Sequence, residues 1–302
     1  MKNVEKKQRS LYIKSGSILS SALKLAQKNV KEGTPLLGLC EKIEKFIEDE
    51  GGKPAFPVNV SINHIAAHFT PSFDSKEVFS DHDVAKVDIG VHLDGCITDS
   101  AVTIDLSGEF GKMLEASEGA LESALSAAMP GIGVGKLGET IEKEIKKKGF
   151  KPVQNLCGHG IEEWVAHASP SIPNTSSKDA RELEPGKVYA IEPFATDGEG
   201  LVHEGVQAEI FGFDEKKPLR SMTGRKISDL VEKDYKGLPF AERWLVKKMK
   251  MSDFERKTAL RELLQKKSIH AYPVLRELEG KIVTQAETTI LVEDKDILVL
   301  VK

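Results

Sequence analysis

Two strand-like runs joined by an Asp-Gly pair are the feature that most constrains how this chain folds. Residues 87–104 read VDIGVHLDGCITDSAVTI, and Asp-Gly between two β-rich runs is typical of a two-residue hairpin turn. The turn sets a register that places Gly90 opposite Asp99. Because side chains alternate between the two faces of a strand, Asp88 and Asp99 then share one face as diagonal neighbours, with backbones about 7–8 Å apart.

Three further polar residues occur in similar settings downstream. His159 stands between two glycines in CGHG, and Glu192 and Glu287 each interrupt an apolar β-rich run. An ionised acid in an apolar strand is costly unless it is paired or bound to metal. Solvent-facing hairpin acids or a hydrogen-bonded structural histidine would explain each case singly. Four acids and one histidine together suit a pair of divalent metal ions.

Composition limits the classes of protein to which this chain can belong. It has 302 residues, of which 40% are hydrophobic and 30% charged, so we expect a globular fold. The net charge of −4 argues against dedicated nucleic-acid binding, and no apolar run is long enough to span a membrane. Three scattered cysteines and a polar N-terminal segment without the apolar stretch of a secretory leader favour the cytoplasm.

The order of the elements predicts an α+β fold. Helices are expected at 8–31, at 35–50 with Thr34 as the N-cap, and at about 108–129 and 136–149. Strands are expected at 55–63, 83–93, 96–106, 152–156, 164–168, 187–195, 204–213, 281–292 and 296–301. Helices precede strands twice, and a short echo between KPAFPVNV at 53–60 and IHAYPVLR at 269–276 favours a duplicated plan. Helices segregated from mostly antiparallel strands form an α+β domain.

Residues 214–268 break this pattern and are interpreted as an inserted helical subdomain. Ser252 and Glu255 form a capping box at the start of one helix. The spacing predicts that its apolar residues face a core, namely Phe254, Leu260, Leu263 and Leu264. Its lysine clusters, KKMK and QKK, suit either contact with RNA or a ribosome or, more plainly, a solvated helix face.

The ordered set VDIGVHLDGCITDSA, CGHG, AIEPFAT and QAETTILV resembles the metallopeptidases of the pita-bread fold. The stretch FPVNVSINHIAAHFTP is similar to the methionine aminopeptidases, and the insertion before HAYPVL resembles their type II class in a short, archaeal-style form. The resemblance runs over almost the whole chain. It implies a pita-bread (creatinase/aminopeptidase-like) fold with pseudo-twofold halves, a catalytic domain of residues 1–213 and 269–302, and a winged-helix-like insertion at 214–268.

The resemblance also implies roles for particular residues. The five metal ligands of the family correspond here to Asp88, Asp99, His159, Glu192 and Glu287. They would hold two ions of Co, Mn, Fe or Zn, bridged by Asp99 and Glu287. Glu192 would also serve as a catalytic residue that handles protons. The residues expected to line the cleft and meet the substrate are His68, His167 and, on the wall of the methionine pocket, Phe56.

The resemblance implies removal of the initiator methionine from nascent chains with a small second residue. The chain is expected to act as a cytoplasmic monomer with the ribosome as a candidate partner, and without membrane or dedicated nucleic-acid partners. One alternative is an X-Pro peptidase on the same scaffold. Another is a catalytically dead relative that binds RNA or ribosomes, although such proteins typically lose ligands and this chain keeps the full set.

Overall fold

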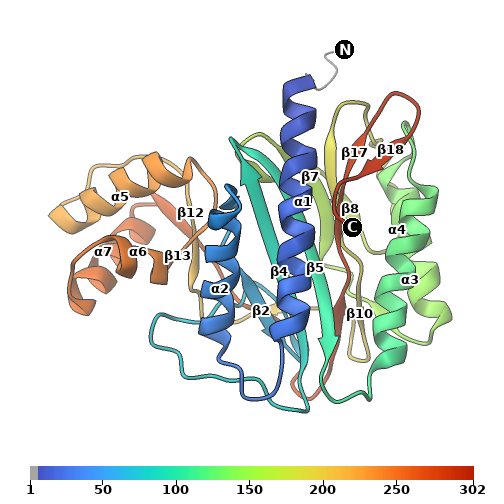
Figure 1. The fold of residues 1–302 in the computed structure, drawn as a ribbon, viewed down its shortest axis with the longest axis horizontal. Coiled ribbons are helices and arrows are strands. Elements are labelled where there is room, and N and C mark those ends of the chain that lie inside the picture. The colour runs from blue at the N-terminus through green and yellow to red at the C-terminus, as the bar shows by residue number, and fades with distance from the viewer. Residues whose placement is uncertain (1–5) are drawn as a thin grey trace.

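Helices alternate with antiparallel strands along the chain (Figure 1), which the computed structural model describes over residues 6–302. Residues 1–5, the start of the polar N-terminal segment, lie outside the described residues. The first half contains α1 (Lys6–Asn29), α2 (Leu36–Asp49), β1 (Lys53–Pro54), β2 (Asn59–Ile62), β3 (Ile65–Ala67), β4 (Val84–Leu93), β5 (Cys96–Asp105), α3 (Gly111–Ala127), α4 (Val134–Lys147) and β6 (Lys151–Pro152).

The second half is richer in short strands. It contains β7 (Cys157–Glu162), β8 (Val165–Pro173), β9 (Val188–Ile191), β10 (Phe194–Thr196), β11 (His203–Glu204), β12 (Ile210–Phe213), α5 (Met222–Tyr235), β13 (Phe240–Ala241), α6 (Glu242–Lys248), α7 (Asp253–Gln265), β14 (Ile269–Tyr272), β15 (Leu275–Arg276), β16 (Val283–Gln285), β17 (Thr288–Val292) and β18 (Ile297–Val299). This content confirms the expected α+β class. None of the described helices is long and apolar enough to cross a bilayer.

Two larger sheets lie at the centre of the molecule. In one, β4 pairs with β1, β2 and β5, and the other runs β18-β17-β9-β7-β8. Helices α1 and α2 lie against the first sheet, whereas α3 and α4 lie beyond the second (Figure 1). The order α1, α2, Lys-Pro strand β1 and hairpin β4-β5 is repeated as α3, α4, Lys-Pro strand β6 and hairpin β7-β8, so the plan is duplicated. The second Lys-Pro strand is at 151–152, and not in the 269–276 stretch that the sequence echo suggested.

Helix α2 shows how the sequence directs packing. Its predicted apolar face is buried, with Leu39, Cys40 and Ile43 at most 1% exposed. The predicted cap is wrong. Pro35 is the N-cap, with no capping hydrogen bond from its side chain, so the helix begins one residue later than expected. Burial of the apolar face, and not the cap, therefore holds this helix in place.

The central hairpin has the predicted register. Gly90 lies opposite Asp99, and Asp88 lies opposite Ala101, with no bulge between β4 and β5. The Asp-Gly turn has positive φ at both residues, 49° and 88°, as a type I′ turn requires. Asp88 and Asp99 therefore share a face of this sheet, and that face is directed toward the second half of the molecule, where β5 lies beside β17 and β7.

Helix α1 packs closely on the end of the chain. A methyl group added at Gly16 would lie 2.1 Å from the carbonyl oxygen of Leu300, so no side chain fits there without moving the backbone. Gly16→Ala is expected to lower the free energy of unfolding by about 1–3 kcal/mol through overpacking. Urea unfolding followed by circular dichroism measures this. Gly111→Ala is the control, because its methyl group meets nothing within 4 Å; equal midpoints for both variants would contradict the expectation.

Three helices, α5, α6 and α7, and the β13-β12-β14 sheet form a unit with an apolar core of its own (left in Figure 1). The capping box at Ser252 and Glu255 is confirmed. Leu260 and Leu263 are buried as expected, but Phe254 is 78% exposed and Leu264 also reaches solvent. We refer to residues 210–272 as the helical unit. The proposed division of the chain into a catalytic domain and a winged-helix-like insertion at 214–268 stays a prediction.

Candidate metal centre

The hairpin brings the first two acids to the middle of the molecule. Asp88 on β4 has Asn59 of β2 as its cross-strand partner, and Asp99 lies diagonally across on β5. The backbone of Asp99 is tied to Thr289 on β17, whose hydroxyl donates to the Asp99 carbonyl at 2.6 Å and accepts from its N–H at 2.7 Å. The hydroxyl of Ser100 donates to the Glu287 carbonyl at 2.5 Å. These hydrogen bonds join β5 of the first half to β17 and Glu287 of the second half, next to the acidic side chains.

The second sheet delivers the other three residues. His159 on β7 pairs with Ala190 of β9. Strand β9 ends at Ile191, which pairs with Thr288 at the start of β17. Glu192 and Glu287 are the next residue beyond that last pair on each strand, so both side chains leave the sheet at the same level. Strand ends are where a sheet can present polar groups without losing ladder hydrogen bonds.

The side chains of these residues converge. His159 Nε2 lies 3.8 Å from Asp99 Oδ2 and 3.6 Å from Glu192 Oε1. One donor atom from each of Asp99, His159 and Glu287 lies within 4.8 Å of the others. Two atoms that each lie about 2.1 Å from one ion are at most about 4.2 Å apart. Both His159 distances meet that limit, so the geometry suits a shared cation.

The tautomer of His159 also suits a ligand. Its Nδ1 lies 3.1 Å from the carbonyl oxygen of Gly160. Because a carbonyl oxygen can only accept a hydrogen bond, Nδ1 carries the proton. The lone pair of Nε2 then faces the acids. The glycines that flank His159 are required by the packing of neighbouring strands. A Cβ at Gly158 would lie 2.4 Å from the Ala190 carbonyl, and one at Gly160 would lie 2.6 Å from that of Ser169, so close strand packing requires both.

The negative charge of the site is uncompensated within the described chain. Among the described residues that line the cavity, none is lysine or arginine. Asp88 Oδ1 and Asp99 Oδ1 are buried without a hydrogen-bond partner. Burial raises the pKa of Asp88 to about 7. Burial, followed by neighbouring carboxylates, raises the pKa of Asp99, Glu192 and Glu287 well above their usual values. Bound divalent cations would satisfy the orphaned oxygens and remove this cost, so the residues present fit a metal site.

A cavity of about 380 Å³ opens at these acids. Every site residue predicted from the sequence lines it: Phe56, His68, Asp88, Asp99, His159, His167, Glu192 and Glu287. The ring centroids of His159 and His167 are 4.5 Å apart, and His68 Nδ1 lies 3.3 Å from the Pro273 carbonyl. The structure therefore brings the set together, while the role of each member stays a prediction.

Gly90, opposite Asp99, packs against the ring of Phe56. A Cβ on Gly90 would lie 2.3 Å from Phe56 Cε1. The absence of a side chain at Gly90 thus lets an aromatic wall stand next to the acids.

Sequence reasoning missed several residues of the site. Gln285 Nε2 donates to Glu287 Oε2 at 3.3 Å, and, against the larger effect of burial, the Gln285 side chain also lowers the pKa of Asp88, so it acts on an acid from each half. The ring of Tyr272 lies 5.5 Å from that of His68 and 6.4 Å from that of His167. The sequence QAETT could have predicted that Gln285 belongs to the site. Side chains alternate along a strand, so residues 285, 287 and 289 lie on one face.

Comparisons with known proteins identify the family and the fold. The model of metallopeptidase family M24 matches residues 10–232. The methionine aminopeptidase of Pyrococcus horikoshii is 44% identical over 288 residues, which cover 95% of this chain and 97% of that protein. Among solved structures, a thermophilic Arx1 superposes with a TM-score of 0.83 at 17% identity, covering 99% of this chain and 91% of the other. Methionine aminopeptidase from Thermotoga maritima gives 0.72 at 20% identity, with both chains fully covered. These structural likenesses confirm the expected pita-bread fold.

Proposed function

Because the chain belongs to metallopeptidase family M24, we propose that it is a methionine aminopeptidase. It removes the initiator methionine from newly made chains whose second residue is small. The observation that carries this proposal is the convergence of four acids and His159 on one cavity that has no lysine or arginine among its described lining residues; Asp99 and Glu287 are buried, and Asp88 and Glu192 are half-buried. The curated relatives named methionine aminopeptidase, 36–44% identical over about 95% of this chain, support the choice of substrate.

Two divalent ions are the cofactors in this proposal. The residues that would hold them are Asp88, Asp99, His159, Glu192 and Glu287. When bound, such ions supply Lewis acidity and a water of lowered pKa at neutral pH. An oxygen-rich set with one imidazole and no thiolate suits Mn, Fe or Co, and also admits Zn.

The side chains of the cavity move protons and hold the substrate. Glu192 accepts a proton as water attacks the scissile carbonyl and passes it to the leaving amine. Burial lowers the pKa of His68, and enclosure in the cleft, with the neighbouring His159 and His68, lowers that of His167. Both rings are therefore neutral near pH 7, and each carries one N–H that can donate to the oxygen on which negative charge develops.

The cavity also suits the first side chain of the substrate. Its volume of about 380 Å³ is small for a ligand pocket, and its apolar lining residues are Phe56, Ala67, Leu156, Phe194, Ile210 and Pro239. Methionine is unbranched and polarisable, so it adapts to such a wall. A free substrate amine near the acids would restrict cleavage to the first peptide bond.

The test is hydrolysis of two peptides by protein stripped of metal and reloaded with Mn²⁺. Met-Ala-Ser is expected to lose its methionine, and Ala-Pro is expected to stay intact. Cleavage of Ala-Pro but not of Met-Ala-Ser would indicate the X-Pro peptidase instead. No cleavage of either peptide, despite bound metal, would indicate a scaffold without activity.

His167→Ala is expected to lower kcat for Met-Ala-Ser by about 100-fold, the cost of one donor to a developing oxyanion. The metal content of the variant, measured by atomic emission, is expected to equal that of the wild type, because His167 is outside the proposed ligand set. A variant that loses metal would show that His167 has been assigned to the wrong role.

We place this activity in the cytoplasm, on nascent chains near the ribosome, and in a monomer. The three cysteines, Cys40, Cys96 and Cys157, are free thiols, which suits a reducing compartment. Gel filtration with light scattering tests the monomer, for which the expected mass is that of one chain, 33.1 kDa.

A further inference from the structure

The link between β1 and β2, residues 55–58, and Asn59 at the start of β2 form part of the wall of the catalytic cavity. Phe56 and Asn59 both line it. Asn59 is also the cross-strand partner of Asp88, and its side-chain amide donates to the Pro57 carbonyl at 3.2 Å. A shift of this link would therefore move both the aromatic wall and the neighbour of a proposed metal ligand.

Both backbone groups of Val58, the last residue of the link, are held by side chains from other elements. Its N–H donates to Glu44 Oε1 of α2 at 3.2 Å. Its carbonyl accepts from the hydroxyl of Thr70 at 2.8 Å. Val58 is fully buried, so no water competes for either group. The position of the link thus depends on where Glu44 and Thr70 lie.

The helical unit in turn holds Glu44 and Thr70. Arg243 of α6 forms a two-pronged pair with Glu44, with Nη1 to Oε2 at 2.6 Å and Nη2 to Oε1 at 2.5 Å. Arg243 Nη2 also donates to Thr70 Oγ1 at 3.1 Å, and the indole of Trp244 donates to Glu44 Oε2 at 3.0 Å. One guanidinium therefore fixes two of the three side chains that bond the Val58 backbone, the third being the thiol of Cys40 at 3.5 Å from the Val58 carbonyl oxygen.

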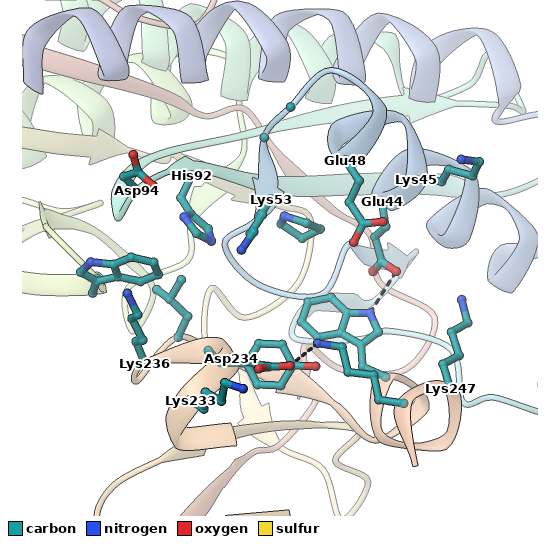
Figure 2. Close-up of a pocket in the computed structure, with 18 of the residues that line it drawn as sticks. Glu44, Lys45, Glu48, Lys53, His92, Asp94, Lys233, Asp234, Lys236 and Lys247 are labelled. Carbon is teal, nitrogen blue, oxygen red and sulfur yellow. Dashed lines mark hydrogen bonds and ion pairs between the residues drawn. The ribbon is translucent and has the colours of Figure 1, made fainter. Parts of the chain in front are cut away.

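These bonds lie beside a second and larger cavity, of about 970 Å³, between α2 and the helical unit. Figure 2 shows Glu44 on the α2 side of this cavity, with a dashed line to the indole of Trp244. The side chains of Arg243 and Glu44 are only 1% and 9% exposed. A planar guanidinium in such a dry site accepts few alternative geometries.

Stability alone is a weak explanation for this pair. Removing two charges from water offsets most of their attraction, and buried ion pairs are often replaceable by apolar residues without loss. Apolar residues could not replace the pair in one respect, because its hydrogen bonds fix the Glu44 carboxylate and the Thr70 hydroxyl relative to the backbone of Val58. Val58 lies between Phe56 and Asn59, which line the catalytic cavity.

We propose that the Glu44–Arg243 pair, together with Thr70, is a positioning device through which the helical unit sets the fit of the substrate's first side chain against Phe56. The inference rests on the proposed function for its substrate. It assigns the helical unit a part in selecting methionine, although no residue of the pair lines the catalytic cavity.

Arg243→Lys is the main variant, because lysine keeps the positive charge but lacks the planar guanidinium that bonds both carboxylate oxygens. For Met-Ala-Ser we expect KM to rise about tenfold, with kcat within about twofold of the wild type. The preference for Met-Ala-Ser over Leu-Ala-Ser is expected to fall about tenfold, because a displaced wall discriminates less between equally large side chains. Unchanged KM and preference would overturn the proposal.

Arg256→Lys is the matched control. Arg256 is an equally buried arginine of the same unit, at 1% exposure, and its bonds to Glu242 and Asp253 stay within that unit. It should leave KM and preference at wild-type values. A loss of preference in this variant equal to that in Arg243→Lys would show a general effect of disturbing the helical unit, and would overturn the proposal.

Hydrogen exchange across residues 55–62 provides a readout that does not need activity. Exchange at the Val58 amide is expected to quicken in Arg243→Lys and also in Thr70→Val, a smaller change that serves if the first variant fails to fold. Unchanged exchange in both, or faster exchange without loss of preference, overturns the proposal. If the wild type cleaves no methionine peptide while exchange quickens as expected, the proposed function fails and the positioning of the link is supported.

Discussion

Asp99→Asn is expected to lower kcat/KM for Met-Ala-Ser by more than about 1000-fold. Removing a partner that only orients a metal ligand costs about 10- to 100-fold, and Asp99 is proposed to contact both ions directly. Its Oδ1 is buried without a partner, and its Oδ2 lies 3.8 Å from His159 Nε2. An amide keeps the shape of the side chain but removes the charge that would hold the two ions together. Steady-state assays with titrated Mn²⁺, together with metal content, measure the effect.

Asp94→Asn is the control for this variant. Asp94 is on the same hairpin, is exposed, and has a φ of 49°, which asparagine tolerates in the same turn. Its activity is expected to equal that of the wild type. Near-normal turnover by Asp99→Asn at any metal concentration would refute the proposed ligand set.

Removing metal is expected to make the stability of the protein fall as the pH rises. In the unfolded chain, the carboxyl groups of these residues have pKa values of about 4. In the metal-free fold, burial raises the pKa of Asp88 to about 7, and burial with neighbouring charges raises those of Asp99 and Glu287. The folded state thus retains protons that the unfolded state releases. The stabilisation is complete below about pH 4 and is lost as the pH rises through about 7, by about 1.4 kcal/mol per pH unit for each retained proton.

Urea unfolding in EDTA at pH 5, 6, 7 and 8 measures this slope. With Mn²⁺ present the slope is expected to flatten or reverse, because the ions bind the deprotonated carboxylates and stabilise the fold that holds them. Metal-free Asp99→Asn should show a shallower slope than the wild type, since one titrating group is gone. Equal slopes with and without metal would show that these acids are not the groups that bind it.

The parts of the site that local rules govern were predictable from the sequence. A two-residue Asp-Gly turn fixes the register of everything within the hairpin, so the shared face of Asp88 and Asp99 followed directly and the structure confirms it. Acids inside apolar runs, such as Glu192 and Glu287, also stood out because burial without a partner is costly. Their spatial convergence with His159, by contrast, was inferred from ligand chemistry and from the resemblance to a family, because no local rule places these distant segments together.

Charged side chains whose partners are far away in sequence could not be predicted to be buried. Arg243 and Glu44 are 199 positions apart, and each alone is an ordinary charged residue on a helix. The same cause explains the error in α7. That helix buries Arg256, at 1% exposure, and leaves Phe254 at 78%, because Arg256 finds Glu242 at 2.5 Å. A pattern based on hydrophobicity places arginine outside and phenylalanine inside, so it assigned Phe254 and Arg256 to the wrong sides although Leu260 and Leu263 are buried as expected.

The bond between Thr289 and Asp99 joins residues 190 positions apart, and this has a consequence for the order of folding. Contacts between distant segments form late, because closing a long loop costs entropy before any contact offsets it. The N-terminal hairpin can form early, but Glu287 reaches it only when β17 docks between β9 and β18. Tight metal capture is thus a late event that reports on completed assembly, and a trapped intermediate lacking β17 would bind ions weakly while keeping most of its helices.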